Sequence, residues 1–292
     1  METKTVKNSI YGKNFRIYDI FLKSILFLSF FIVSAFFIYF LFYIFEKGIF
    51  HLNFKLISNV VDGVEKGILP VIINTFYIVF LTLLIATPIG IGCAIYLTQY
   101  EKNQKLFNIV SFLTNTLASI PSILIGLFGY SLFCVGFGLG PSILAGCLTV
   151  SLTVLPNIIE TSKESLLSVP SSYKKGALAL GASKFKVIFN LILPSAMPGI
   201  LTALILSAGK IIGESASLLL TVGTANKLPK NILTHIFKSG KTLTLHLYFT
   251  AGNGNSHDAI NLCFAVAIIL IFFSFFLNCL TKIIGHFAKN KS

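Results

Sequence analysis

Long apolar runs constrain this chain more than any other feature of its sequence. A helix rises about 1.5 Å per residue, so about 20 apolar residues cross a hydrocarbon core of about 30 Å. Six stretches meet or approach this length: Phe21–Phe45, Val71–Leu97, Leu106–Leu132, Ile143–Ile159, Gly199–Leu220 and Asn261–Ile284. Backbone groups in lipid must be satisfied within the segment, so runs without alternation predict helices. We expect an all-α integral membrane protein with about six transmembrane helices.

The basic residues indicate how these helices are oriented. The formal net charge is +13, but the lysines and arginines gather in tails and short connecting segments, which argues against nucleic acid as a partner. Lys4, Lys7, Lys13 and Arg16 precede the first run, so the positive-inside rule predicts a cytoplasmic tail over residues 1–20. The first run is longer than a signal-peptide core, and we expect it to remain as a helix. Threading six spans places the C-terminus in the cytoplasm as well.

Residues that commonly carry catalysis or bind metals are scattered along the chain. The cysteines, at positions 93, 134, 147, 263 and 279, lie in or beside apolar runs without C-x-x-C spacing, as is typical of thiols in a packed core. The five histidines do not form the cluster that a metal site requires. Nucleophile, phosphate-loop and dinucleotide motifs are also missing. We therefore expect no catalytic residue, metal site or bound cofactor in this chain.

Two charged residues, Lys210 and Glu214, interrupt the apolar run Gly199–Leu220. Charges at membrane depth are costly to keep, which makes them candidates for a functional site. Their spacing predicts that both side chains lie on one helical face, where each partly neutralises the other. From these residues alone, a structural salt bridge and a path for a charged solute are equally supported.

The segment before Gly199 has the local chemistry of two short helices joined by a tight turn. Ser171 or Ser172 can cap a helix that runs through Leu180. Gly181 can adopt the left-handed conformation that ends this helix, and Ser183 can cap a second helix that returns to the membrane. The pattern predicts a rigid protrusion on the cytoplasmic surface.

The same segment, residues 160–194, resembles the coupling loop of bacterial ABC importer permeases. That family has the pattern E-A-A, three residues, Gly, nine residues, I-x-L-P. Three residues match it in register: Gly181, Leu193 and Pro194. Lys175 and Gly176 stand where the family has Glu and Ala, and Leu191 replaces Ile, so the charge at position 175 is reversed. The resemblance implies that the residues coupling the chain to an ATPase are Tyr173, Lys174, Lys175, Gly176, Ala177, Leu180 and Gly181.

Other motifs are similar to those of phosphate ABC importer permeases. They are N-T-F-Y from Asn74, T-P-I-G-I-G-C-A-I-Y-L from Thr87, I-P-S-I-L-I-G-L-F-G from Ile120 and A-G-K-I-I-G-E-S from Ala208. The stretch T-L-T-L-H-L-Y from Thr242 favours the A-type subunit of that system over its C-type partner. The resemblance covers roughly residues 70–282 and implies one permease domain over residues 21–292.

The resemblance implies a transport subunit rather than an enzyme, namely a permease of an ATP-driven importer for inorganic phosphate. A homologous permease would complete the heterodimer, two ATPase subunits would bind ATP and Mg, and an extracytoplasmic phosphate-binding protein would dock on segment 227–258. Lys210, where the family has Arg, would offset the desolvation of the anion, and Glu214 would keep Lys210 charged.

Three alternatives remain open from the sequence. The cargo could be another oxyanion, sulfate or molybdate, because the binding protein chiefly sets its identity. An ion-coupled secondary transporter could use Glu214 as a proton-coupling carboxylate. A structural membrane subunit could use the charge pair for assembly only.

Prolines and glycines inside the apolar runs favour helix kinks or close helix packing. Residues 119–129 are a candidate gating element.

Overall fold

All regular elements that the computed structural model describes are helices. The description covers residues 13–52, 67–101, 103–225, 231–253 and 257–289. The longer α-helices are α1 (Lys13–Gly48), α3 (Leu69–Ile95), α4 (Gln104–Ser119), α6 (Ile143–Leu167), α9 (Leu193–Gly213), α12 (Leu243–Asn253) and α13 (His257–Lys289). The shorter ones are α5 (Ser122–Gly129), α7 (Ser171–Ala179), α8 (Lys184–Val187), α10 (Ala216–Thr221) and α11 (Ile232–His235). Single 3₁₀ or π-helical turns extend α1, α3, α5 and α8.

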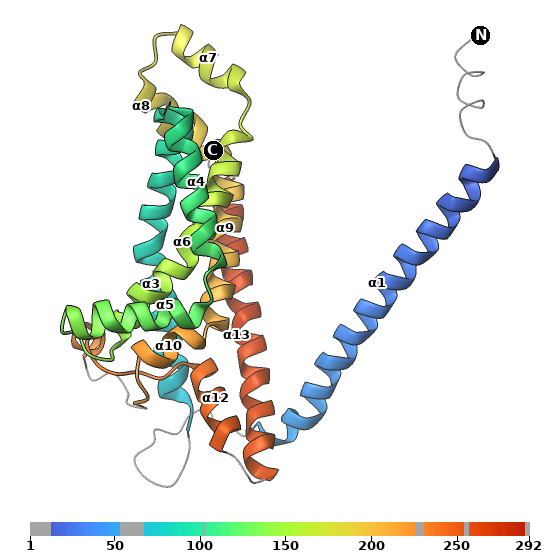
Figure 1. The fold of residues 1–292 in the computed structure, drawn as a ribbon, viewed down its shortest axis with the longest axis vertical. Coiled ribbons are helices and arrows are strands. Elements are labelled where there is room, and N and C mark those ends of the chain that lie inside the picture. The colour runs from blue at the N-terminus through green and yellow to red at the C-terminus, as the bar shows by residue number, and fades with distance from the viewer. Residues whose placement is uncertain (1–12, 53–66, 102, 226–230, 254–256, 290–292) are drawn as a thin grey trace.

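Five of these helices are long and apolar enough to cross a membrane, and α4 with α5 would make a sixth span. This finding confirms the predicted fold class. Helices α3, α6, α9 and α13 form the main bundle, with α7 and α8 at one end and α10 and α12 at the other (Figure 1).

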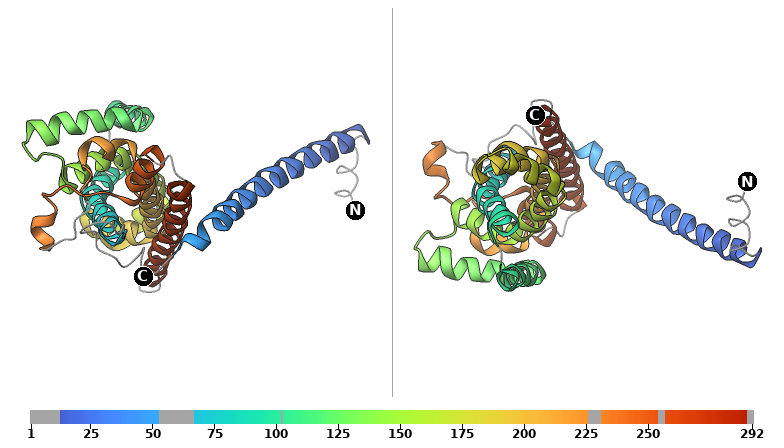
Figure 2. Two further views of the ribbon diagram at one scale, coloured as in Figure 1. Left: turned by 90° about the horizontal axis from the view of Figure 1, so that it is seen from below. Right: turned by 90° about the horizontal axis from the view of Figure 1, so that it is seen from above.

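Helix α1 leaves this bundle as a single long arm (Figure 2). None of its most apolar window is buried. It touches the bundle near its C-terminal end, where Tyr43 and Phe45 pack edge-on against Phe264 and Phe272 of α13. Helix α1 begins at Lys13, inside the tail predicted over residues 1–20, of which residues 1–12 lie outside the described part.

The core of the bundle is mainly apolar, and some of its polar groups are paired across helices. Its central cluster joins buried side chains of α3, α6 and α9, including Ile78, Val154 and Ile211. Between α6 and α9, the Asn157 amide donates to the Ser207 hydroxyl at 3.1 Å, and the Ser165 hydroxyl donates to the Ala196 carbonyl at 2.9 Å. Such bonds stabilise helix pairs in lipid, where an unpaired polar group is costly.

The predicted span 106–132 is not one straight helix. It breaks between Ser119 and Ser122, where the chain turns by 99°. Ile120 and Pro121 have extended backbone, because proline lacks an N–H and disfavours helical geometry in the residue before it. The Ser119 hydroxyl donates to the Thr116 carbonyl at 2.7 Å and so satisfies a carbonyl at the broken end.

Helix α5 therefore lies across the bundle and packs closely on α10 and α6. A Cβ atom on Gly126 would come within 2.8 Å of the Ser217 Cα on α10. A Cβ atom on Gly129 would overlap the Thr149 side chain of α6. Both positions need glycine because backbone meets backbone or a buried side chain there.

The predicted span 199–220 also differs from the structure. Helix α9 begins earlier, at Leu193, and ends at Gly213, because Glu214 has extended backbone with a ψ of 122°. Helix α6, in turn, continues beyond the predicted end at Ile159 to Leu167. As a result, Glu160 and Lys163 lie inside α6, whereas Glu214 lies beyond the end of α9.

The leucines from Leu243 alternate along the sequence as in a strand, but they form helix α12. Leu243 and Leu245 are both buried, and the Leu243 N–H donates to the Thr75 hydroxyl of α3 at 3.0 Å. The neighbouring α11 is anchored by His235, whose Nε2 lies 2.8 Å from the Asn74 Oδ1. Residues 226–230 and 254–256 lie outside the described part.

Candidate translocation path and coupling surface

Lys210 lies one turn before the end of α9 and reaches across to α6. Its Nζ donates to the Thr153 carbonyl at 2.9 Å, and the residue is exposed on the surface of the isolated chain. Thr153 precedes Pro156, a helix-interior proline that leaves the ladder of α6 incomplete in this region. A carbonyl dipole stabilises the ammonium without neutralising it. The positive charge is therefore available to an anion.

Glu214 does not pair with Lys210, so the prediction that the two neutralise each other on one helical face is wrong. The helix ends between them at Gly213, and the described part of the chain has no ion pair joining them. Instead, the Glu214 Oε1 accepts from the Ser217 N–H at 3.1 Å, and its backbone carbonyl accepts from the Thr244 hydroxyl at 3.0 Å. Glu214 is buried and ties the end of α9 to α10 and α12.

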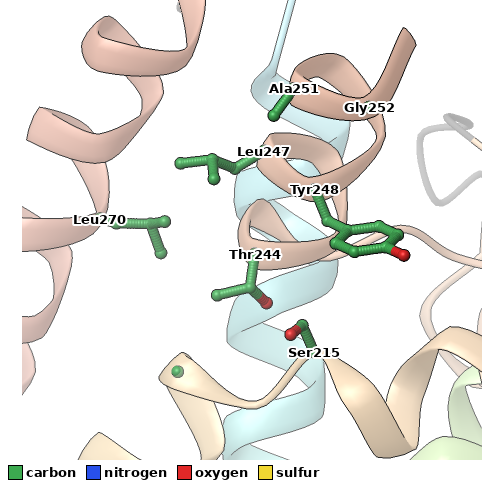
Figure 3. A pocket seen from close by; sticks show the side chains of 8 residues that line it. Ser215, Thr244, Leu247, Tyr248, Ala251, Gly252 and Leu270 are labelled. Carbon is green, nitrogen blue, oxygen red and sulfur yellow. The ribbon is translucent and has the colours of Figure 1, made fainter.

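A cavity of about 600 Å³ opens beside this helix break (Figure 3). Its lining combines hydroxyl groups with apolar side chains: Gly213, Ser215, Thr244, Leu247, Tyr248, Ala251, Gly252 and Leu270. The Ser215 and Thr244 hydroxyls lie toward each other across it. The helix that carries Lys210 therefore ends beside a cavity that has both polar and apolar walls.

The other end of the bundle carries the predicted coupling segment. Helix α7 begins at Ser171 directly after Pro170, and neither Ser171 nor Ser172 caps it with a side-chain bond, so that detail of the prediction is wrong. Proline itself occupies the capping position, with a ψ of 130°. The predicted cap of the second helix is confirmed, because the Ser183 hydroxyl accepts from the Lys186 N–H at 3.4 Å.

The end of α7 is the predicted left-handed turn. The helix stops at Ala179 rather than Leu180, and Gly181 has a φ of +82°. The Gly181 N–H donates to the Leu178 carbonyl at 3.0 Å, and the Ala182 N–H donates to the Ala177 carbonyl at 3.1 Å. These two bonds form a Schellman motif, which fixes the angle between α7 and α8.

Helix α7 is held on its inner side and exposed on its outer side. The Lys174 Nζ of α7 donates to the Gln99 Oε1 at 2.8 Å, and the Lys184 ammonium of α8 lies 4.1 Å from the centre of the Tyr100 ring; Gln99 and Tyr100 belong to the π-helical turn that follows α3. Burial, followed by the charge of Lys184, lowers the pKa of the Lys174 ammonium.

The predicted coupling residues are therefore close together but face different surroundings. Ala177 packs against the bundle, whereas Tyr173 is 55% exposed and Leu180 is 90% exposed. Lys175 and Gly176 are also exposed. An exposed leucine beside an exposed tyrosine on a rigid, anchored helix provides a surface for a protein partner.

One charged group within the bundle was not predicted as a site residue. Lys163 is only 8% exposed and contacts Glu160 on the same helix and Ser111 on α4. Because the sequence placed the end of this span at Ile159, both Glu160 and Lys163 were assigned to the cytoplasmic segment. The signal that would have found them is the apolar periodicity that continues through Leu166.

Comparison with known proteins places this geometry in a family. Residues 86–289 match the family described as "Binding-protein-dependent transport system inner membrane component". The chain is 30% identical over 260 residues to the probable ABC transporter permease protein YqgI of Bacillus subtilis (strain 168), covering 85% of this chain and 88% of that protein. It is 34% identical over 251 residues to the phosphate transport system permease protein PstA of Haemophilus influenzae, covering 85% and 87%.

Solved structures share the fold at lower identity. A chain of a bacterial alginate ABC transporter has a TM-score of 0.64 at 13% identity, covering 95% of this chain and 96% of that chain. A chain of the inward-facing MetNI methionine ABC transporter has a TM-score of 0.58 at 20% identity, covering 76% and 94%. The chain therefore belongs to the binding-protein-dependent transport system inner membrane components, the non-catalytic permease subunits of ABC importers.

Proposed function

We propose that this permease moves inorganic phosphate across the cell membrane with energy from a separate ATPase. The observation that carries the proposal is the Lys210 ammonium, which is exposed near the end of a membrane helix and, among the residues that the structure describes, is held by the Thr153 carbonyl. The similarity to the Haemophilus PstA permease, which extends over most of both chains, supports phosphate as the cargo.

The chemistry of Lys210 suits a site that an anion must leave as well as enter. An ammonium offsets the cost of stripping water from phosphate. Transport also requires that the anion be released, so a site that binds too strongly would stop conduction. Lysine provides a point charge rather than the planar fork of arginine, and the Thr153 carbonyl competes for one of its donors. Both features favour transient contact.

Glu214 contributes to this path by position rather than by neutralising Lys210. Its carboxylate is occupied by the Ser217 N–H, and its carbonyl holds Thr244. In this proposal Glu214 keeps α9 broken at Gly213 and keeps the cavity open beside the break. Phosphate would pass between that cavity and Lys210.

The assembly follows from what one chain leaves uncovered. ABC importer permeases pair with ATPase subunits and a binding protein. Here Lys210 is exposed and α1 lies apart from the bundle, so we propose a homologous permease that completes the path and contacts α1. Helix α7 would dock on an ATPase that binds ATP and Mg. A phosphate-binding protein would dock at the opposite end, on segment 227–258.

The orientation proposed for this multi-pass inner membrane protein is that α7 and both termini face the cytoplasm. The positive charge of the N-terminal tail supports this orientation. In this proposal α4 with α5 makes one span, so that the chain crosses the membrane an even number of times and both termini lie on the same side. Labelling of a single cysteine introduced at Lys175 from the cytoplasmic side only would support it, and labelling from outside would reverse it.

Sulfate or molybdate remains the alternative cargo, since both are tetrahedral oxyanions that a lysine can attract. The ion-coupled alternative no longer applies, because the chain belongs to an ABC importer permease family. Reconstitution of the complete importer in proteoliposomes tests the cargo. ATP-dependent uptake of radiolabelled phosphate that excess sulfate and molybdate do not suppress supports the proposal, whereas uptake of another oxyanion overturns it.

Variants of Lys210 test the path itself. Lys210→Ala and Lys210→Glu should abolish uptake while the complex still assembles, because the cation is lost or reversed. Lys210→Arg should retain uptake. Lys105→Ala, which removes an exposed lysine at the start of α4, is the matched control. Normal uptake by Lys210→Ala would place the path elsewhere.

A further inference from the structure

Lys163 is a buried cation that links two helices near the coupling segment. It lies one turn before the end of α6, and its side chain is 10% exposed. Its Nζ lies 2.5 Å from the Glu160 Oε2 and donates to the Ser111 hydroxyl of α4 at 3.0 Å. It also lies 5.2 Å from the centre of the Phe107 ring, which belongs to α4 as well. We call these four residues the α4–α6 clamp.

The clamp is an expensive arrangement for simple packing. The Lys163 side chain is 10% exposed and the Glu160 side chain is 27% exposed, so the pair is largely removed from water; this removal is costly, and well-packed apolar residues often stabilise a protein as much or more. The second carboxylate oxygen of Glu160 is buried without a hydrogen-bond partner among the described residues. Lys163 lies within the candidate span Ile143–Leu167, and charges inside membrane spans usually serve function. Beyond packing, the clamp joins α6 to α4 through the hydrogen bond from Lys163 to Ser111 and the contact of the Lys163 ammonium with the Phe107 ring.

The clamp lies between the coupling segment and the helices that surround the translocation path. Helix α6 leads into α7 after only residues 168–170, so movement of α7 reaches α6 directly. Helix α4 packs mainly on α6 and leads into α5, whose Gly126 packs on Ser217 of α10. Ser217 in turn holds the Glu214 carboxylate. A continuous set of contacts therefore runs from α7 to the break beside Lys210.

We infer that Lys163 is a positioning residue that makes α4 move with α6, so that movement of α7 is transmitted through α5 and α10 to the translocation path. Without the clamp, α6 moves while α4 lags behind, and α5 is driven only through its own contact with α6 at Gly129 and Thr149. ATP is then hydrolysed without a matching movement of cargo. The inference rests on the proposed function, because its readout is phosphate moved per ATP hydrolysed.

The test compares uptake and ATP hydrolysis in the same proteoliposomes. The double variant Glu160→Gln, Lys163→Met removes both charges and leaves no buried ion unpaired, so the complex should still assemble. Allosteric coupling energies correspond to about 5- to 150-fold effects, and we expect about a tenfold fall in phosphate moved per ATP, with binding-protein-stimulated hydrolysis nearly unchanged. Ser111→Ala, which removes one α4 contact only, should lower the same ratio less.

Two further variants separate positioning from a structural role. Lys163→Arg keeps a cation and should restore most of the ratio, and Lys105→Met should leave it unchanged. A double variant with a normal ratio would overturn the inference, and so would equal losses of uptake and hydrolysis, which indicate reduced assembly alone. Absence of phosphate uptake by the wild-type complex would instead refute the proposed function.

Discussion

The contacts of Glu214 lead to a prediction that separates two roles for this carboxylate. If Glu214 acts by capping α10, an oxygen acceptor is needed and the charge is not. Glu214→Gln retains an amide oxygen for the Ser217 N–H, whereas Glu214→Ala removes the acceptor. If Glu214 acts through its charge on Lys210, both substitutions should damage transport equally. The structure favours capping, because the carboxylate bonds to Ser217 and not to Lys210.

The expected magnitudes follow from the burial of these groups. Ser217 is fully buried, so Glu214→Ala leaves an N–H without a partner, at a cost of about 1–3 kcal/mol. A bond to a charged acceptor contributes about 1.5–3 kcal/mol and a neutral one about 0.5–1.5 kcal/mol, so Glu214→Gln should cost only about 1 kcal/mol. The Thr244 bond to the backbone carbonyl remains in both variants.

Thermal unfolding of the assembled importer in detergent measures the loss of stability, and uptake in proteoliposomes measures the effect on transport. The midpoint of thermal unfolding should fall most for Glu214→Ala and slightly for Glu214→Gln. Uptake by the Gln variant should stay within about twofold of wild type, which corresponds to a change well below about 1 kcal/mol in the free-energy barrier to transport. Complete loss of uptake by Glu214→Gln, with an unchanged midpoint, would refute capping and return the charge to the mechanism.

Three other predictions follow from the described contacts. Gly181→Val should uncouple hydrolysis from uptake, since a φ of +82° costs a β-branched residue about 1–3 kcal/mol; Gly176→Ala, which has open space around it, is the control, and equal coupling in both would contradict this. Gly126→Ala should lower the thermal midpoint by separating α5 from α10, while Gly92→Ala, with nothing near its Cβ position, should not; similar midpoints would refute the close packing. Burial and then the charge of Lys238 lower the pKa of His235, so its stabilising effect is present above its ordinary value of 6.5 and lost as the pH falls through the lowered value. Limited proteolysis at pH 7.5 and 5.5 should show this loss, and His235→Gln should remove the pH dependence.

The positions of the membrane spans were predictable from the sequence, but the breaks at Pro121 and Gly213 were not. Apolar length predicted the five long membrane helices and the region of the bent pair α4 and α5, but it did not predict the 99° turn at Pro121, because a proline inside a span can kink or end a helix depending on its neighbours. Apolar length also predicted a helix through Glu214, because apolarity continues across residues 199–220, whereas α9 ends at Gly213 and the Glu214 carboxylate accepts from the Ser217 N–H.

The coupling segment was predicted in more detail because its signals are local. Gly181 ends α7 in the left-handed region, and Ser183 caps α8, as expected from their positions in the sequence. Each signal acts within a few residues, so no knowledge of the bundle was needed. The serine cap at the start of α7 failed because Pro170 already occupies that position.

The sequence by itself predicted that this chain spans a membrane, that it has about six transmembrane helices and that two short helices joined by a tight turn protrude between two of them. These properties depend on hydrophobicity and on contacts between neighbours in the chain. Only the tertiary structure decided which charges meet: Lys210 with a carbonyl of α6, Glu214 with α10, and Lys163 with α4. Partners 50 or more residues apart, as for Lys210 and Lys163, are chosen by helix packing, which a one-dimensional pattern does not contain.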